Sequence, residues 1–170
     1  EKIHVIILSG ISQKKPEDVM RGEETQIAGY LLKNKLFKGS ICLPGTHSKW
    51  VQILDMKIIK FNTFLTGELF EIIKHNSILS YNLKSNELDQ KLMLEAAQTI
   101  MQDPSLFTNK LFNIRAKGLL RKTSDLENNS MITGYIIGME IIACKSYWED
   151  KDVILIGSQK LNQLYKLILN

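Results

Sequence analysis

The stretch from Ser40 to Phe64 constrains the fold of this chain more than any other. It holds short apolar runs rich in β-branched and aromatic residues, with turn residues between them. The runs are 41–43, 50–54 and 57–61, and the turns are Pro44-Gly45 and Asp55-Met56. Such a pattern indicates strands joined by short connections. We therefore predict a three-stranded β-meander, which excludes an all-helical fold.

Other strands and helices are predicted on both sides of the meander. Strands are expected at 3–8 and 153–156, with a polar loop at 12–18 and a loop with a helix cap at 128–130. Helices are expected at about 23–35, 66–75, 86–102, 104–120 and 131–147, and from Ser158 onwards. Thr66 and Asn86 are the expected N-caps of their helices. This order predicts an α/β fold with a mixed sheet and flanking helices, as in a ribonuclease-H-like (actin-like ATPase) lobe.

Composition narrows the class of protein. The chain has 170 residues, 44% of them hydrophobic, which suits a folded domain. No apolar run approaches the roughly 20 residues that span a bilayer, so we expect no membrane partner. The net charge is +4, but the lysines are scattered and not interleaved with aromatic residues, which argues against nucleic-acid binding. Cys42 and Cys144 lie in apolar runs, which favours buried free thiols and a cytoplasmic location.

The first segment that could carry chemistry surrounds the start of the helix at 23–35. It brings together the carboxylates of Asp18, Glu23 and Glu24 and the guanidinium of Arg21. A kinase needs a carboxylate within reach of the hydroxyl that it deprotonates, and a helix start with an arginine suits anions. The alternative interpretation is a solvated, well-capped helix start.

The second segment is the turn between the first two strands of the meander. Gly45 allows a ligand to approach the backbone, Thr46 and Ser48 carry hydroxyls, His47 is a neutral donor, and Lys49 carries a positive charge. These groups could form a phosphate cradle. The alternative is an ordinary polar hairpin. With three histidines in the chain and no cysteine spacing, we predict no metal cluster.

A third segment follows the strand at 153–156. A strand that ends in glycine before a helix, here Gly157 and Ser158, can receive a nucleotide, although the pattern is common. Gly134 and Gly138 lie four residues apart in an apolar helix, which is more typical of close helix packing than of catalysis.

Several segments, taken in order, resemble one known family. They are Asp18-Val-Met-Arg-Gly-Glu-Glu-Thr-Gln, Leu43-Pro-Gly-Thr-His-Ser-Lys-Trp, Phe64-Leu-Thr-Gly-Glu-Leu-Phe, Leu111-Phe-Asn-Ile-Arg-Ala, Thr133-Gly-Tyr-Ile-Ile-Gly-Met-Glu and Leu155-Ile-Gly-Ser. Together they resemble the 2-dehydro-3-deoxygalactonokinases. The resemblance implies a sugar kinase of the actin-like superfamily that uses ATP and Mg²⁺. It implies transfer of the γ-phosphoryl group to the 6-hydroxyl of 2-dehydro-3-deoxy-D-galactonate, in cytoplasmic galactonate breakdown.

The same resemblance implies roles for individual residues. It matches the turn Gly45, Thr46, His47, Ser48 and Lys49 to a phosphate-binding turn, and Gly157 and Ser158 to an adenosine-binding turn. It makes Glu23, then Glu24, then Asp18 the candidates for the catalytic base. It also suggests Arg21 for the sugar carboxylate, and Thr66, Gly67 and Glu68 for sugar or phosphate.

One departure from the family affects the prediction of activity. Family members are longer at the N-terminus, and the segment Ile3–Leu8 is not followed by an Asp-x-Gly-Thr-type turn. We therefore expect residues 1–38 to lead from a missing N-terminal lobe and residues 39–170 to form the C-terminal kinase lobe. Two hypotheses follow. The chain is the C-terminal lobe of a working kinase, by fragmentation or by pairing with a separate N-terminal chain, or it is a non-catalytic module that binds a ligand or partner or only folds. An uncovered apolar lobe face also predicts self-association, as in a homo-oligomer, or poor solubility.

Overall fold

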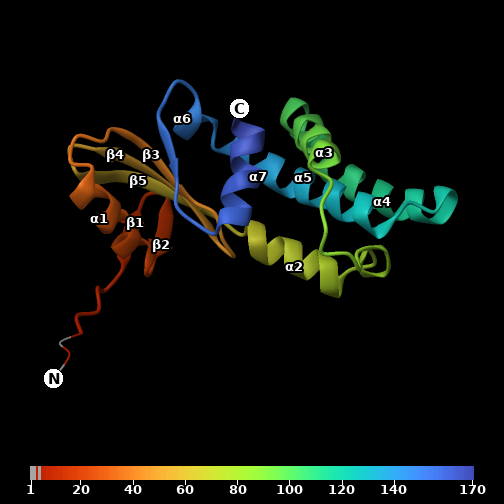
Figure 1. The fold of residues 1–170 in the computed structure, drawn as a ribbon, viewed down its shortest axis with the longest axis horizontal. Helices are drawn as coiled ribbons and strands as arrows, with labels where there is room; N and C mark the ends of the chain where they lie inside the picture. Colours follow the sequence, from red (N-terminus) through yellow and green to blue (C-terminus); the bar gives the residue numbers. More distant parts are fainter. Residues whose placement is uncertain (1–2, 4) are drawn as a thin grey trace.

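The structure, a computed structural model, describes residue 3 and residues 5–170, in which most strands precede a run of helices and one strand and one helix close the chain (Figure 1). The strands are β1 (Ile11–Lys14), β2 (Glu17–Met20), β3 (Gly39–Leu43), β4 (Ser48–Leu54), β5 (Lys57–Phe64) and β6 (Val153–Leu155). The α-helices are α1 (Glu23–Lys33), α2 (Thr66–Asn76), α3 (Gln90–Gln102), α4 (Phe107–Arg121), α5 (Asp125–Ala143), α6 (Lys145–Trp148) and α7 (Gln159–Leu169). Short 3₁₀ turns are η1 (Ser80–Asn82) and η2 (Pro104–Leu106).

The main sheet has the strand order β5-β4-β3-β6. β3, β4 and β5 pair antiparallel with their neighbours in sequence, and Ile41 lies opposite Val51, which lies opposite Phe61. β6 pairs parallel with β3, so that Cys42 lies beside Leu155. The predicted α/β fold with a mixed sheet and flanking helices is confirmed.

The N-terminal part differs from the prediction. The expected strand at 3–8 is absent from residue 3 and residues 5–8, and His4 lies outside the described residues. Ile6 and Ile7 are more than four-fifths exposed. The β-branched run is not paired with another strand in the part described, and an unpaired run gains nothing from its β propensity. The polar stretch predicted as a loop forms the β1–β2 hairpin instead.

The helical part extends away from the sheet, with α4 at the far end and α5 running back from there to α7 (Figure 1). α3 and α5 pack closely because Gly134 and Gly138 leave room for the other helix. A Cβ at Gly138 would lie 2.8 Å from the carbonyl oxygen of Ala97. The prediction that these glycines serve helix packing is confirmed.

Two predicted helix starts are wrong. Residues 128–130 do not form a loop but lie buried inside α5, which begins after a capping box made by Ser124 and Glu127. The N-cap of α3 is Asp89 instead of Asn86, because the Asp89 carboxylate accepts hydrogen bonds from two free N–H groups of the first turn.

The core consists of three apolar clusters. One joins β2, α1 and the sheet, a second lies among α2, α3, α4 and α5, and a third connects the sheet to α5 and α7. Cys42 and Cys144 belong to the third cluster and are buried free thiols, as predicted. None of the described helices is long and apolar enough to cross a membrane.

Candidate active site

The turn between β3 and β4 separates the predicted phosphate ligands into two groups. Thr46 and His47 are exposed and Gly45 is half-buried, whereas Ser48 and Lys49 are buried at the start of β4. Exposure ends at Ser48 because β4 begins there, and the first two residues of β4 lie within the sheet. The turn therefore offers Gly45, Thr46 and His47 to a ligand, while Ser48 and Lys49 point to partners within the protein.

The start of α2 lies directly against this turn. The backbone N–H of Glu68 donates to the carbonyl oxygen of Thr46 at 3.0 Å, and the His47 imidazole contacts the Glu68 carboxylate. A Cβ at Gly67 would lie 2.6 Å from the carbonyl oxygen of Gly45 and 2.7 Å from Cα of Thr46. Only glycine permits this approach, so the turn and the positive end of the α2 dipole are held together.

The loop after β6 lies beside the same turn. The N–H of Ile156 donates to the carbonyl oxygen of Cys42 at 2.9 Å, continuing the parallel pairing of β6 with β3. A Cβ at Gly157 would lie 3.1 Å from the carbonyl oxygen of Pro44. Ser158 accepts a hydrogen bond from the N–H of Leu161 and caps α7. The carboxyl ends of parallel strands meet at one sheet edge, which brings the two predicted nucleotide turns together.

A cavity of about 420 Å³ opens beside the two turns. The turn, α2, α5 and α7 form its walls, and apolar side chains line much of it. The apolar residues are Phe70, Leu88, Ile136, Ile137, Leu161 and Leu164. Lys74 and Lys160 also line the cavity, and both ammonium groups donate to the residues of the 85–86 loop. Apolar walls with a few polar and cationic groups are typical of a small-molecule site.

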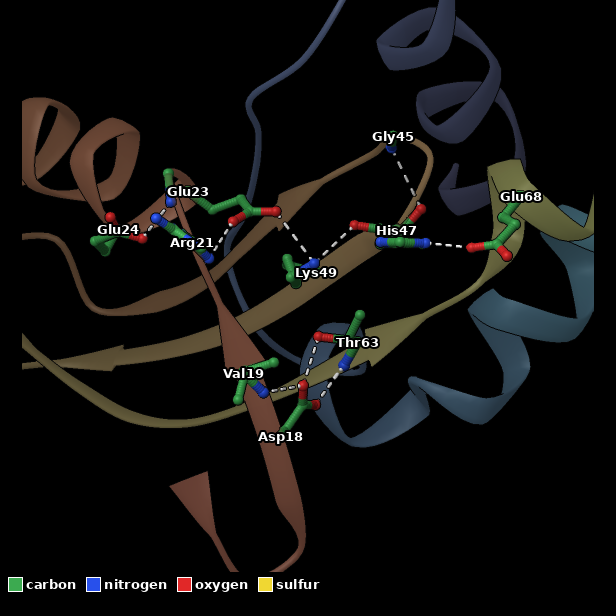
Figure 2. Close-up of polar contacts among 12 residues, drawn as sticks. Asp18, Val19, Arg21, Glu23, Glu24, Gly45, His47, Lys49, Thr63 and Glu68 are labelled. Atoms are coloured by element: carbon green, nitrogen blue, oxygen red, sulfur yellow. Dashed lines mark hydrogen bonds and ion pairs between the residues drawn. The ribbon is translucent and has the colours of Figure 1, made fainter. Parts of the chain in front are cut away.

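The Asp18 carboxylate accepts hydrogen bonds from β5, the edge strand of the main sheet. It accepts the N–H of Thr63 at 2.7 Å, the hydroxyl of Thr63 at 2.6 Å and the N–H of Val19 at 2.7 Å (Figure 2). On the same hairpin, Gln13 bonds both the N–H and the carbonyl of Phe61. These two side chains satisfy the free edge of β5 as a neighbouring strand would. Asp18 thus has a structural role in the edge.

Glu23 is paired with Lys49. Its carboxylate lies 3.1 Å from the Lys49 ammonium and accepts the N–H of Arg21 at 2.9 Å. Figure 2 shows Lys49 between Glu23 and His47, whose carbonyl oxygen accepts from Lys49 at 3.1 Å. Partial burial raises the pKa of Glu23, but the backbone hydrogen bonds and Lys49 outweigh it and lower the pKa overall. The predicted base and a predicted phosphate ligand are therefore in direct contact.

The two other residues of this helix start have different surroundings. Glu24 is 7% exposed, and its carboxylate turns back to accept the N–H of Gly22 at 2.7 Å. The Arg21 side chain is exposed beside Glu23. Of the three predicted base candidates, Glu23 is therefore the one with both a cationic neighbour and partial exposure.

The sequence interpretation missed Glu140, a buried carboxylate in α5. It is 2% exposed and accepts hydrogen bonds from Trp50 at 2.7 Å, from Tyr165 at 2.7 Å and from Thr66. Burial raises its pKa, although the hydrogen bonds oppose the increase. A signal was present in the sequence: Glu140 is the one charged residue in the apolar run 131–143. A buried charge of this kind requires partners.

Thr66 does not have the role predicted for it. The N-cap position of α2 is Leu65, without a side-chain cap. The Thr66 hydroxyl donates to the Glu140 carboxylate, although the residue also lines the cavity. The prediction that Thr66 is the N-cap is therefore wrong, because its hydroxyl donates to a buried carboxylate in α5 and does not accept from the first turn of α2.

The carboxylates that the structure describes form no metal cluster of their own. Among the residues that the structure describes, no group of three or more potential His, Cys, Asp or Glu ligands converges. Nearby carboxylates are already engaged by Lys49, by backbone N–H groups or by neutral donors. These residues do not fit a metal site assembled by this chain alone.

Comparison with known proteins identifies the family. The family model described as 2-keto-3-deoxy-galactonokinase matches residues 1–170. The chain therefore belongs to a family of sugar kinases, the 2-keto-3-deoxy-galactonokinases. The resemblance predicted from the sequence motifs is confirmed.

Similar proteins include two curated relatives and a solved structure. A probable 2-dehydro-3-deoxygalactonokinase of Rhizobium meliloti (strain 1021) is 37% identical over 169 residues, which cover 96% of this chain and 55% of the relative. The 2-dehydro-3-deoxygalactonokinase of Escherichia coli (strain K12) is 28% identical over 159 residues, covering 92% and 53%.

The solved structure, from Sinorhizobium meliloti, is described as a candidate 2-dehydro-3-deoxygalactonokinase. It superposes with a TM-score of 0.87 at 36% identity, over 94% of this chain and 55% of the other. The chain spans about half the length of the relatives that it matches.

Proposed function

We propose that this chain supplies the nucleotide-binding part of an ATP-dependent sugar-acid kinase. The proposed reaction transfers the γ-phosphoryl group of ATP to the 6-hydroxyl of 2-dehydro-3-deoxy-D-galactonate, in cytoplasmic galactonate breakdown. The single observation that carries the proposal is the contact between the two turns, where Gly157 approaches the carbonyl oxygen of Pro44 beside a cavity. The names of the relatives support the choice of substrate.

The strand order supports the further proposal of a ribonuclease-H-like lobe. Three antiparallel strands, consecutive in sequence, are extended by one parallel strand next to the first of them. In such a lobe the ligand is bound at the carboxyl ends of β3 and β6, where the two turns lie.

The exposed part of the turn is proposed to hold the phosphates. Gly45 allows a close approach to the backbone of the turn, Thr46 offers a hydroxyl, and His47 offers an imidazole at the surface. The α2 start, through Gly67 and Glu68, lies close enough to complete this cradle. The adenosine is assigned to Gly157, Ser158 and the apolar cavity. Lys49 and Ser48 support the turn from inside rather than meeting the phosphates.

Glu23 is our first candidate for the base, followed by Glu24 and Asp18. In the proposed step a carboxylate accepts the proton of the sugar hydroxyl, the hydroxyl oxygen bonds to the γ-phosphorus, and the bond to ADP breaks. Because its pKa is lowered, Glu23 is ionised at neutral pH, and its partly exposed carboxylate is proposed to accept the proton beside its contact with Lys49. The exposed Arg21 guanidinium is suited to the planar carboxylate of the sugar acid.

Mg²⁺ enters this proposal only as a companion of the nucleotide. The kinase family implies the ion, and when bound it would neutralise phosphate charge. The described carboxylates form no cluster for it, so we assign it to no residue of this chain and derive no step through it.

A second part of the active site is proposed to come from outside these 170 residues. The chain matches 55% and 53% of its two curated relatives, so their remaining parts have no counterpart in it. We propose that this remainder, as a lobe or a partner chain, closes the site over ATP and excludes water. The alternative is a module that binds nucleotide or self-associates without catalysis.

An ADP-release assay with ATP, Mg²⁺ and a panel of 2-keto-3-deoxy sugar acids tests the proposal. The chain is assayed alone and with the unmatched part of the Rhizobium meliloti relative supplied as a second polypeptide. We expect release only in the combination, with the galactonate-derived acid, and at least a hundredfold less with Glu23→Gln. Release by the chain alone would refute the need for a second part. Nucleotide binding without release in any combination would favour the non-catalytic module.

A further inference from the structure

A single buried carboxylate connects four elements of the molecule. Glu140 of α5 accepts hydrogen bonds from Trp50 in β4, from Thr66 in α2 and from Tyr165 in α7. Its side chain thus ties the sheet, the start of α2 and the last helix to the centre of the longest helix. None of the roles proposed above for the reaction uses it.

The hydrogen bonds continue from Glu140 to the turn between β3 and β4. The Tyr165 hydroxyl lies 3.1 Å from Oγ of Ser48, and the N–H of Gly45 donates to the same Oγ at 3.4 Å. A backbone N–H can only donate, a carboxylate only accepts, and each hydroxyl has one proton. The direction of the series is therefore fixed: Gly45 donates to Ser48, Ser48 to Tyr165, and Tyr165 to Glu140.

A second branch reaches the other side of the turn. The Thr66 hydroxyl donates a hydrogen bond to Glu140. The next residue, Gly67, lies against Gly45 and Thr46. Glu140 consequently holds the turn from two directions, through the Tyr165–Ser48 series and through the start of α2.

A carboxylate in this position is expensive if it only fills space. Its burial disfavours the charged form, and an apolar side chain of similar volume would avoid that cost. What a carboxylate provides and an apolar residue does not is a common acceptor that orients three donors at once.

We propose that Glu140 is a positioning residue that preorganises the Gly45–His47 turn for the terminal phosphates of the nucleotide. The inference rests on the proposed function, in which that turn holds the phosphates. It adds a specific consequence. The Ser48 and Thr66 hydroxyls donate their hydrogen bonds to Tyr165 and Glu140. The phosphates are therefore bound by the backbone of the turn and by Thr46 and His47, and not by Ser48 or Thr66.

The fold offers a matched pair of tyrosines for the test. Tyr165 and Tyr147 are both buried in the third apolar cluster, and each donates a hydroxyl hydrogen bond to a side-chain oxygen. The acceptor of Tyr147 is Asn62 in β5, at 2.5 Å, and this bond does not lead to the turn. Tyr165→Phe breaks the series from Glu140, whereas Tyr147→Phe removes a comparable hydrogen bond elsewhere.

The measurement is the affinity of each variant for ADP and for adenosine, by calorimetry in the presence of Mg²⁺. Tyr165 also lines the cavity assigned to adenosine, and phenylalanine keeps its ring there while removing only the hydroxyl. We therefore expect Tyr165→Phe to bind ADP about tenfold more weakly but adenosine within about twofold of the unmodified chain, with both affinities unchanged in Tyr147→Phe. An equal loss of affinity for ADP and for adenosine in Tyr165→Phe would indicate a general loss of structure and would count against the proposal. Equal ADP affinity in the two variants would overturn the proposal.

Amide hydrogen exchange keeps the test independent of the proposed function. If the unmodified chain binds no ADP, the proposed function fails in this chain. The Gly45 amide is still expected to exchange about tenfold faster in Tyr165→Phe than in Tyr147→Phe. Equal exchange would overturn the positioning role. Ser48→Ala, which removes the acceptor of the Gly45 N–H, replaces Tyr165→Phe if that variant does not fold.

Discussion

Two carboxylates near the β3–β4 turn have opposite environments. Glu23, the outer carboxylate, has a side chain that is 25% exposed and is paired with the Lys49 ammonium. Glu140, the inner carboxylate, is 2% exposed and accepts hydrogen bonds from neutral donors. The pKa of Glu23 is lowered by backbone hydrogen bonds and a nearby cation, against partial burial, whereas burial raises the pKa of Glu140.

The difference separates the two roles that we propose for carboxylates near this turn. A carboxylate that accepts a proton from a substrate must be ionised and reachable from solvent, and Glu23, our proposed base, is partly exposed and has a lowered pKa. A carboxylate that orients several hydroxyls must be enclosed by them, which describes Glu140. The outer carboxylate is therefore expected to govern turnover, and the inner carboxylate is expected to govern stability and the geometry of the turn.

The largest effect is expected when the inner carboxylate is removed. Glu140→Ala leaves two buried donors, Trp50 and Tyr165, and the half-buried Thr66 without their acceptor, and should lower the free energy of unfolding by about 3–5 kcal/mol. Urea denaturation measures it, with the exposed Glu95→Ala on α3 as the control, for which about 0.5 kcal/mol or less is expected. A loss below about 1 kcal/mol for Glu140→Ala would contradict the assigned role.

A glycine substitution tests the packing of α2 against the turn. Gly67→Ala places a Cβ within 2.7 Å of two backbone atoms of the turn, and overpacking of this kind costs about 2 kcal/mol. Gly29→Ala is the matched control, since Gly29 lies in α1 with open space around it. That substitution should stabilise the protein by about 0.5–1 kcal/mol. Thermal unfolding of both variants measures the difference. Equal shifts of the unfolding midpoint in the two variants would refute the close packing of α2 against the turn.

The pH dependence of stability should have opposite signs for the two carboxylates. The folded pKa of Glu23 lies below the ordinary 4.5, so its contribution is present above that value and is lost as pH falls through the folded pKa. The folded pKa of Glu140 lies above 4.5, so ionisation costs stability as pH rises from 4.5 through the folded pKa.

Gln substitutions convert these signs into a measurement. Relative to Glu23→Gln, the unmodified protein should gain stability as pH rises toward 4.5. Relative to Glu140→Gln, it should lose stability as pH rises above 4.5. Denaturation midpoints across the acid range give both differences, and slopes of the same sign would show that the two environments are not as described.

The smallest effect is expected at the exposed pair on the turn. His47 and Glu68 are 46% and 44% exposed in their side chains, so solvent screens their contact. His47→Gln should change the free energy of unfolding by about 0.5 kcal/mol or less. A loss above about 1.5 kcal/mol in chemical denaturation would show that the pair holds α2 to the turn more strongly than its backbone hydrogen bond does.

Much of the fold could be predicted from local patterns. The strands at 41–43, 50–54 and 57–61 and most helices follow from periodicity and turn residues, because these signals act within a few positions of each other. Residues 3–8 were predicted as a strand because of the same β-branched pattern. A strand also needs a partner, and pairing with a distant segment is invisible in local sequence.

The candidate site could be predicted only in part, for a similar reason. The turn at Gly45 and the loop at Gly157 are short motifs, and both were identified from sequence. The division of the turn into an outer and an inner side depends on where β4 begins, and the role of Asp18 depends on the free edge of β5. The role of Glu140 depends on contacts with residues up to 90 positions away, which local sequence patterns do not reveal.

The position of the nucleotide is the most direct test of the account. Backbone amide chemical shifts of the isotope-labelled chain, followed during titration with ADP and Mg²⁺, report which residues meet the ligand. The account predicts the largest changes at Gly45, Thr46 and His47 and at Gly157 and Ser158, with the Asp18 hairpin unaffected. Saturable changes confined to other surfaces, with these two turns silent, would contradict it.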